Sequence, residues 1–420
     1  MKILFVHQNF PGQFKSLAPA LVADGHEVAA LRLGSASIGQ VSGIKVHEYS
    51  AHRSSTKNIH PWLTDFETKI IRAESCCAKA QKLNADGYVP DVIMAHHGWG
   101  ESMFLKEIWP NAKLCIYCEF HYSAKGQDVG FDPEFPVSGQ ESENCRIKLK
   151  NLNNILHFEI ADTAISPTAW QASTFPAPFR DKISVIHDGI DTDVARPNSK
   201  ANFTLTVHGN QKIKITSSDE IITFVNRNLE PYRGYHSFMR ALPTILKNRP
   251  EARILIIGGN EVSYGPPPNL QKYKKTSWKE IYVDELRPKI SKKDWQRIHF
   301  LGSIDYSLYL KVLQVSSCHI YLTYPFVLSW SLLEAMSIGC PIVASDTAPL
   351  KEVITDRKTG ILTNFFAPEK IAKEAIDVLA DKKKANAIGV SARQFIIENY
   401  DLKTKCIPEQ IKFLEKMHAA

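Results

Sequence analysis

Short apolar segments alternate with segments of helical periodicity along this chain, and the alternation strongly restricts the fold. The first apolar segment is KILFV at residues 2–6, and loop residues Asn9–Gly12 follow it. From Gln13 onward, apolar residues recur at helical spacing, and a second apolar segment begins at Glu27. A strand, a helix and a second strand in this order form a right-handed crossover between parallel strands.

The alternation occurs twice, which predicts two domains of one kind. Further strands are expected at 91–95, 114–120, 161–165 and 183–186 in the first series, and at 221–226, 253–258, 298–301, 319–323 and 341–345 in the second. We predict an α/β protein with two Rossmann-like, doubly wound parallel-sheet domains that face each other across a cleft. Ligands of such sheets bind beyond the carboxyl ends of the strands.

The expected boundaries follow from a loss of periodicity after His187. We predict an N-terminal domain at 1–190, a linker at 191–215 and a C-terminal domain at 216–398. The last helix, in 399–420, is expected to pack back toward the N-terminal domain.

Composition narrows the function classes. The chain has 420 residues with 23% charged residues and a net charge of +7, which excludes a disordered chain or a small disulfide scaffold. The positive surplus lies in residues 201–420, where 31 basic and 22 acidic residues give +9. This surplus suits an anionic ligand such as a nucleotide phosphate, and it is too scattered to predict nucleic-acid binding.

The eight cysteines are expected to be reduced thiols in a cytosolic protein. Cys115 and Cys118 have the spacing of a metal clip, but they lie in an expected strand without a second pair, so we predict buried thiols and no metal site. Neither a secretory signal nor a membrane span is expected. Peripheral membrane contact stays open, because residues 272–279 combine four lysines with a tyrosine and a tryptophan. A solvated loop is the simpler interpretation of that segment.

Two arginines are the first candidates for binding. Arg227 follows an expected strand, and Arg233 lies six residues later, just before Gly234 and a helix. Guanidinium groups beside a helix N-terminus are suited to a pyrophosphate. Ordinary ion pairs with Glu230 are the alternative. Glu334, near the start of an apolar helix, needs a partner, and a pair of sugar hydroxyls is one candidate; stabilisation by the helix dipole is the other.

The first half has candidates after three of its expected strands. Gly12 would let a phosphate approach a helix N-terminus, unless it is a plain turn glycine. His121 is expected to face the cleft, although a lone histidine is more often structural. His97 and Trp99 also follow a strand, Glu119 lies at the close of one, and all three are candidates for contact with an acceptor. The loop at 121–140 is long enough to suggest a functional role.

Longer segments carry a family resemblance. HQNFPGQF, GFDPEFP, SPTAWQASTFP and HDGID in the first half, and NRNLEPYRGYHSFMRALP, GGNEVSYG and SLLEAMSIGCPIVAS in the second, are similar to those of family 4 glycosyltransferases. The resemblance covers nearly the whole chain. It implies the GT-B fold, which consists of two Rossmann-like domains.

The resemblance also implies roles for individual residues. Arg227 and Arg233 would bind the donor diphosphate, Gly12 would lie near the donor phosphate, and His121 would touch the donor sugar. The remaining donor-binding positions would be Gly259, Val327, Leu328, Ser331 and Glu334, of which Glu334 would hold the ribose and Val327 and Leu328 would offer backbone amides. Phe326 stands where the family has a second glutamate that contacts the donor sugar.

The implied activity is that of a retaining glycosyltransferase for cell-surface polysaccharide synthesis. Its donor would be a nucleoside diphosphate sugar (a UDP- or GDP-sugar), and its acceptor a glycan or a lipid-linked molecule. No cofactor or metal is expected, because the arginines would stabilise the leaving group. A sugar-nucleotide epimerase and a catalytically degenerate, nucleotide-binding subunit are the alternatives. A dehydrogenase is disfavoured because no G-x-G-x-x-G follows a strand.

Overall fold

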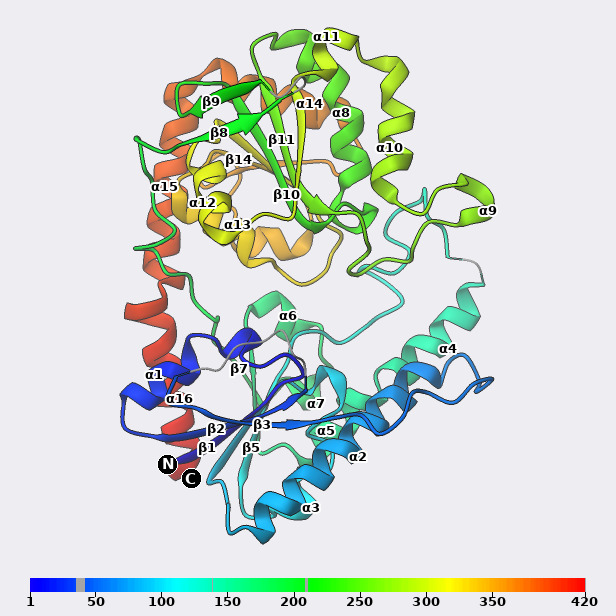
Figure 1. Ribbon diagram of the computed structural model, residues 1–420, viewed down its shortest axis with the longest axis vertical. Helices are drawn as coiled ribbons and strands as arrows, with labels where there is room; N and C mark the ends of the chain where they lie inside the picture. Colours follow the sequence, from blue (N-terminus) through cyan, green and yellow to red (C-terminus); the bar gives the residue numbers. More distant parts are fainter. Residues whose placement is uncertain (35–41, 138, 208–210, 420) are drawn as a thin grey trace. The chain divides into compact units, whose positions relative to one another are not determined.

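The computed structural model describes residues 1–34, 42–137, 139–207 and 211–419. The chain forms two compact units: unit 1 comprises Met1–Gly189 and Leu402–Ala420, and unit 2 comprises Ile190–Asp401. The C-terminal helix, red in Figure 1, therefore belongs to the same unit as the blue N-terminal elements.

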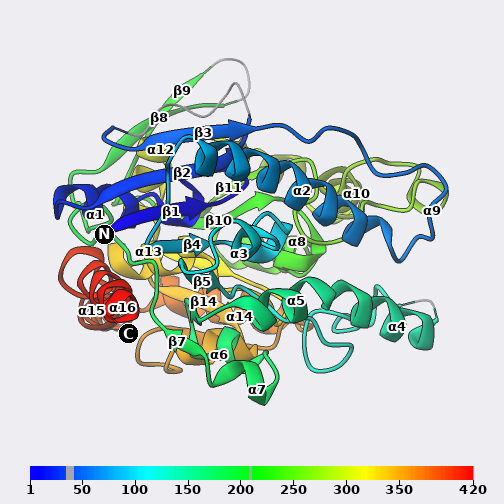
Figure 2. The same cartoon turned by 90° about the horizontal axis from the view of Figure 1, so that it is seen from below.

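Unit 1 is built on seven parallel strands in the order β3-β2-β1-β4-β5-β6-β7 (Figure 2). The strands are β1 (Lys2–Val6), β2 (Glu27–Leu33), β3 (Lys45–Tyr49), β4 (Val92–Ala95), β5 (Lys113–Tyr117), β6 (Thr163–Ser166) and β7 (Ile183–Val185). The helices are α1 (Leu17–Ala23), α2 (Thr64–Ala85), α3 (Leu105–Ile108), α4 (Gln140–Lys150), α5 (Leu152–Ile160), α6 (Ala169–Ser173), α7 (Ala177–Arg180) and α16 (Ile407–Ala419). The strand order reverses between β1 and β4.

Both faces of this sheet are covered, and β1 shows why its sequence is continuously apolar. Ile3 and Phe5 pack into one core cluster with α1 and α16, while Leu4 and Val6 pack into another with α2 and α5. All four side chains are fully buried. A strand with helices on both faces has no polar face, so the pattern KILFV correctly predicts a central parallel strand.

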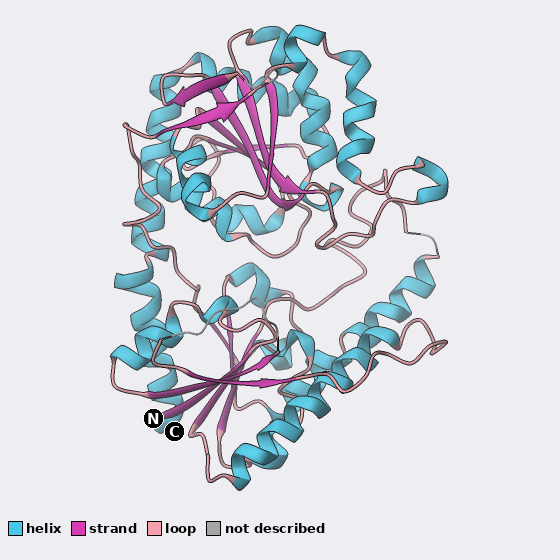
Figure 3. Ribbon diagram, viewed as in Figure 1, coloured by secondary structure: helices cyan, strands magenta, loops and turns pink. Residues whose placement is uncertain are grey.

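Unit 2 is built on six parallel strands in the order β12-β11-β10-β13-β14-β15. Figure 3 shows the strands in magenta with helices in cyan around them. They are β10 (Ile221–Asn228), β11 (Arg253–Gly259), β12 (Ile298–Gly302), β13 (Cys318–Tyr321), β14 (Ile342–Ser345) and β15 (Ile361–Thr363). The helices are α8 (Tyr235–Asn248), α9 (Leu270–Tyr273), α10 (Trp278–Leu286), α11 (Lys292–Trp295), α12 (Tyr306–Gln314), α13 (Trp330–Ile338), α14 (Pro368–Ala380) and α15 (Lys382–Tyr400). This doubly wound order reverses between β10 and β13.

The segment expected as a linker, 191–215, contains regular structure. β8 (Asn202–Thr206) and β9 (Lys212–Thr216) form an antiparallel pair. Phe203, Leu205 and Ile215 are buried in the same core cluster as β10 and α12. The alternation of buried and exposed residues along β8 has the period of a strand with one solvated face, which explains how it differs from the central strands.

α4 and α5 are separated at Asn151. Its side chain donates to the carbonyl of Tyr122 at 2.8 Å and accepts from the amide of Tyr122 at 3.1 Å. This pairing with a neighbouring loop separates α4 from α5 and places Lys150, the last residue of α4, beside Tyr122.

All eight cysteines are free thiols, and Cys115 and Cys118 are both buried. No helix in the described part of the chain has the length and apolarity required to span a bilayer. One group of metal-type side chains, Asp24, His26 and Glu415, places ligand atoms within 4.8 Å of one another in unit 1.

Candidate functional site

In unit 2, the residues expected to bind the donor gather at the carboxyl end of the sheet. Arg227 is the penultimate residue of β10, Gly259 ends β11, and Phe326, Val327 and Leu328 lie between β13 and α13. Because all these strands are parallel and β10 neighbours both β11 and β13, their ends meet at one edge. The sheet order reverses there, which is where doubly wound folds bind ligands.

Arg227 is exposed and makes no hydrogen bond or ion pair with any residue that the structure describes. Glu230 does not neutralise it. The Glu230 carboxylate is fully buried and accepts from the backbone amides of Ser263, Tyr264 and Gly265 at 3.0–3.3 Å. Burial raises the pKa of this carboxyl group despite those amides. Arg227 is therefore a charged group available to a ligand.

Arg233 has a different environment, because it is buried. Its Nη1 atom donates to Thr323 Oγ1 at 2.7 Å and to the carbonyl of Val327 at 3.2 Å. The guanidinium carbon also lies 4.7 Å from the centroid of the Tyr264 ring. These contacts tie the turn before α8 to the loop between β13 and α13. Gly234 permits the approach, since a Cβ there would lie 2.2 Å from Leu322 Cβ.

Glu334 lies on α13 and is 9% exposed. Its Oε1 atom accepts from the Tyr306 hydroxyl and its Oε2 atom from the Tyr309 hydroxyl, both at 2.8 Å. These tyrosines, three residues apart on α12, are partners that the sequence analysis missed; their helical spacing beside a glutamate-bearing helix is a weak signal. A carboxylate oxygen has two acceptor positions, so each oxygen retains capacity for a ligand hydroxyl.

The start of α13 is capped within the fold. The Ser329 hydroxyl accepts from the Ser331 amide at 3.3 Å, and the two hydroxyl groups lie 2.9 Å apart. Leu328 and Ser331 are partly buried, and the carbonyl of Val327 is used by Arg233. Ser331 is therefore part of the helix cap.

Phe326 is 6% exposed and belongs to an aromatic cluster. Its ring centroid lies 5.2 Å from the rings of both Tyr232 and Tyr264, and 5.9 Å from the Arg233 guanidinium carbon. Where the family has a glutamate, this chain presents aromatic surface next to a buried cation. The face of this loop is consequently less polar than the family pattern predicts.

In unit 1, Gly12 contacts a histidine that the sequence analysis missed. A Cβ at Gly12, where φ is +46°, would lie 2.2 Å from Cε1 of His7. His7 Nε2 donates to Gln13 Oε1 at 2.6 Å, and Nδ1 accepts from the Asn9 amide at 2.9 Å. Burial and the neighbouring His96 lower the pKa of His7 to about 3. The signal for His7 was its position directly after β1.

His121 follows β5 by four residues and is partly buried. Its backbone amide donates to Thr174 Oγ1 at 3.1 Å, and its ring lies 5.6 Å from the Phe175 ring. Burial lowers the pKa of His121, which favours a neutral imidazole.

The three acceptor-side candidates line one cavity of about 120 Å³ in unit 1. His97 is buried, and its ring nitrogens lie 3.0 Å from the Tyr117 carbonyl and 2.7 Å from Asn154 Oδ1, so it is held by the fold. Trp99 stacks on His96 at 4.2 Å, and Glu119 is partly exposed. The cavity lies near the ends of β4 and β5, beside the point where the sheet order reverses.

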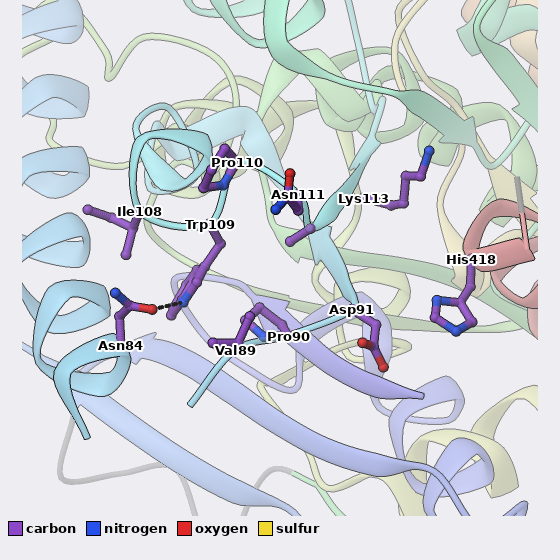
Figure 4. A pocket seen from close by; sticks show the side chains of 11 residues that line it. Asn84, Val89, Pro90, Asp91, Ile108, Trp109, Pro110, Asn111, Lys113 and His418 are labelled. Atoms are coloured by element: carbon purple, nitrogen blue, oxygen red, sulfur yellow. Dashed lines mark hydrogen bonds between the residues drawn. The ribbon is translucent and has the colours of Figure 1, made fainter. Parts of the chain in front are cut away.

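A larger pocket of about 350 Å³ lies at the opposite edge of the same sheet (Figure 4). Asp91 and Lys113, at the amino ends of β4 and β5, line it together with Trp109 and His418. The Trp109 indole donates to Asn84 Oδ1 at 3.1 Å. Since ligands of doubly wound sheets bind at the carboxyl ends, volume alone does not identify the functional site here.

Comparison with known proteins agrees with this architecture. A model of the glycosyl transferase family 4 group matches residues 24–195, and a model of glycosyl transferases group 1 matches residues 209–395. An uncharacterized glycosyltransferase of Methanocaldococcus jannaschii is 30% identical over 49% of this chain and 48% of its own. The chain thus spans about half the length of that relative.

Two further proteins extend the comparison. A GDP-mannose-dependent alpha-(1-6)-phosphatidylinositol monomannoside mannosyltransferase of Mycolicibacterium smegmatis is 23% identical over 67% of this chain and 66% of its own. The crystal structure of HepE from Anabaena in complex with UDP has a TM-score of 0.68 at 17% identity, covering 99% of this chain and 100% of that one. Together with the two family matches, these findings show that the chain belongs to the family 4 glycosyltransferases with the GT-B fold.

Proposed function

We propose that this protein is a retaining glycosyltransferase that moves a sugar from a UDP- or GDP-sugar to a hydroxyl group of a glycan or glycolipid in cell-surface polysaccharide synthesis. The guanidinium of Arg227, exposed at the carboxyl edge of the unit 2 sheet and unpaired among the described residues, carries the proposal. The relatives' names support it, since one is a GDP-mannose-dependent enzyme acting on a glycolipid and another was crystallised with UDP.

The proposed reaction needs a group that stabilises the leaving diphosphate. As the bond between the anomeric carbon and the diphosphate oxygen breaks, its electron pair stays on that oxygen. The acceptor hydroxyl oxygen bonds to the anomeric carbon on the same face, and its proton passes to the leaving phosphate oxygen. Arg227 would bind this developing charge, and Arg233 would hold the loop beside it in place. Removing one such donor costs about 3–4 kcal/mol in the barrier by analogy with oxyanion donors.

Glu334 would accept the ribose hydroxyls in this proposal, with its carboxylate oriented by Tyr306 and Tyr309. Gly12, Gly259 and the loop amides of Val327 and Leu328 would complete the donor contacts, and His121 would touch the sugar as a neutral side chain. The arginine takes the place of a metal ion, and no cofactor is part of the proposal.

The test compares Arg227→Ala with a matched control, Arg253→Ala. Arg253 lies at the amino end of the neighbouring strand β11, at the opposite edge of the sheet. With a panel of UDP- and GDP-sugars and lipid or glycan acceptors, we expect Arg227→Ala to lower kcat about 10²–10³-fold and Arg253→Ala to leave it unchanged. Normal turnover by Arg227→Ala would refute the assignment.

Two further readouts address the mechanism and the alternatives. Nuclear magnetic resonance of the first-formed product should show the donor's anomeric configuration; an inverted product contradicts the retaining mechanism. Incubation with a nucleotide sugar alone should yield no isomeric nucleotide sugar, and its formation would favour the epimerase alternative.

A further inference from the structure

The cavity of about 120 Å³ in unit 1 contains a lysine without an acceptor. Lys69 and Lys150 both line it, from α2 and α4. Lys69 pairs with Asp65 Oδ2 at 2.8 Å. Lys150 makes no hydrogen bond or ion pair with any residue in the described ranges, and its Nζ atom lies 3.5 Å from the centroid of the Tyr122 ring. One cation at this cavity therefore lacks an anionic or polar partner among the residues that the structure describes.

The environment of Lys150 makes this arrangement costly for folding. Burial lowers the pKa of Lys150 to about 8, because the charged form loses hydration. The charges that act on it have both signs: Asp65 and Asp128 favour the ammonium, while Arg146 and Lys69 oppose it. An aromatic face only partly replaces the lost water. A poorly solvated cation in a cavity is typical of a position that a ligand completes.

Two further side chains at the cavity, His96 and Asn153, carry buried polar atoms that make no hydrogen bond with the described residues. His96 Nδ1 accepts from the Gly98 amide at 3.3 Å, which leaves Nε2 as the N–H donor of the ring. Nε2 is buried without a hydrogen bond, and Glu119 Oε2 lies 3.7 Å away. Asn153 donates to the His97 carbonyl at 2.8 Å through Nδ2, while its buried Oδ1 has no partner. Asn153 thus offers an acceptor, whereas the His96 N–H already faces the Glu119 carboxylate.

These groups define the chemistry of a fitting ligand. The Lys150 ammonium matches a negatively charged oxygen, and Asn153 Oδ1 matches a hydroxyl group. Trp99 and Phe120 also line the cavity and provide apolar surface for ring C–H groups. The volume equals that of about four water molecules, so the cavity holds a charged group and its neighbouring carbons, with the rest of a larger molecule outside.

We propose that this cavity binds the acceptor through a phosphate or carboxylate group on a hydroxylated carbon frame, and that Lys150 selects for the charge. That the bound molecule is the acceptor rests on the function proposed above, whereas anion binding by the cavity is independent of that function. Lys150 is a specificity residue in this proposal, and Arg227 in unit 2 has no part in it.

The test measures equilibrium binding by calorimetry on the full-length protein without donor. The probes are glucose 6-phosphate, glucuronate and inorganic phosphate, with glucose as the neutral comparison. The variants are Lys150→Met and a matched control, Lys148→Met. Lys148 lies in the same last turn of α4, experiences the same helix dipole and is exposed. Arg227→Ala reports on an anion held in unit 2 instead.

We expect glucose 6-phosphate to bind at least about tenfold more tightly than glucose, and Lys150→Met to remove that preference, as the loss of one charged hydrogen bond implies. Lys148→Met and Arg227→Ala should bind the probe like the wild type. The proposal is overturned if the wild type binds glucose and glucose 6-phosphate equally well, or binds no anion at all. It is also overturned if Lys150→Met keeps the wild-type affinity for glucose 6-phosphate, or if Arg227→Ala loses that binding.

Further measurements separate this proposal from the first one and identify the source of the anion. UDP and GDP binding should be lost in Arg227→Ala and kept in Lys150→Met. If Arg227→Ala still binds UDP and GDP while the glucose 6-phosphate results hold, the donor assignment is refuted and the cavity assignment stays intact. Vesicles of phosphatidylinositol in phosphatidylcholine present the same chemistry as a lipid headgroup. Lys150-dependent binding to these vesicles indicates a lipid source, and Lys150-dependent binding only to glucose 6-phosphate indicates a soluble one.

Lys150→Met also yields a stability readout that guards against misfolding. Met has a similar volume without the charge, so the variant should have an equal or higher melting temperature than the wild type. Lower affinity together with undiminished stability is the result expected of a binding residue. A lower melting temperature would show that Lys150 stabilises the fold, which contradicts the argument.

Discussion

Nη1 of Arg233 donates to the hydroxyl of Thr323 at 2.7 Å inside unit 2, so this arginine is part of the fold. Arg227, six residues earlier, is exposed and unpaired among the described residues. The two guanidinium groups that the sequence pairs on one diphosphate therefore have different environments. Arg227 is free to bind, and Arg233 positions the loop between β13 and α13.

This difference predicts that substitution of Arg233 destabilises the fold much more than substitution of Arg227. Arg233→Met should lower the free energy of unfolding by about 2–3 kcal/mol, because Thr323 and the Val327 carbonyl lose a charged donor. Arg227→Ala should change it by less than about 0.5 kcal/mol. Chemical denaturation measures both values. An Arg233→Met protein as stable as the wild type would mean that the internal contacts contribute nothing.

The two tyrosine contacts of Glu334 should also be unequal. Tyr309 is 9% exposed, whereas Tyr306 is 50% exposed. Tyr309→Phe removes a buried hydrogen bond to a carboxylate and should cost about 1.5–3 kcal/mol. Tyr306→Phe should cost less than half as much, because water replaces the lost donor. Thermal unfolding of the two variants tests this order, and the reverse order would contradict it.

The close approach of Gly12 to His7 predicts a large effect of a single methyl group. Gly12→Ala adds an atom 2.2 Å from the His7 ring, in addition to the strain of a positive φ. Gly25, with φ of +85° and no atom within 4 Å of its Cβ, is the matched control for that strain. Gly25→Ala should cost about 1–2 kcal/mol, and Gly12→Ala should cost about 1–3 kcal/mol more through overpacking. Equal losses would show that the His7 ring moves aside freely.

Buried histidines should make the protein sensitive to acid. The pKa of His7 is about 3, well below the unfolded value near 6.5. Between these values the unfolded chain binds a proton that the folded chain does not, so stability falls as pH falls from 6.5 toward 3. The slope is up to about 1.4 kcal/mol per pH unit for one histidine. His7→Gln should reduce the slope of unfolding free energy against pH, and an unchanged slope would contradict this origin.

Anion binding in unit 1 should weaken at alkaline pH. With a pKa of about 8, Lys150 loses its charge at a lower pH than an ordinary lysine does. Affinity for glucose 6-phosphate should therefore fall between pH 7 and 9.5. The bound anion favours the ammonium, so it raises the pKa of Lys150 in the complex. Asp65, Asp128, Arg146 and Lys69 also face this group. In Lys150→Met the affinity should be flat over the same range, whereas a wild-type decline retained in the variant would implicate another group.

Much of the architecture follows from sequence periodicity. KILFV and the other continuous apolar segments specify strands buried on both faces, and the order of strand and helix specifies parallel sheets whose carboxyl ends carry the binding residues. β8 and β9 were missed because short strands with one solvated face resemble polar loop sequence. The same difficulty applies to β3, whose residues Lys45–Tyr49 include two charged side chains.

The sequence by itself determined the fold class, the family and the strand ends at which Arg227 and Gly259 lie. The tertiary structure alone decided which polar groups are available to ligands. The partners of Arg233 and Glu334 come from segments 90 and 25–28 residues away, and the environment of Lys150 is set by side chains of α2, of α4 and of the loop after β5. Pairing and burial are properties of neighbours brought together by folding, and local residue patterns do not encode those neighbours.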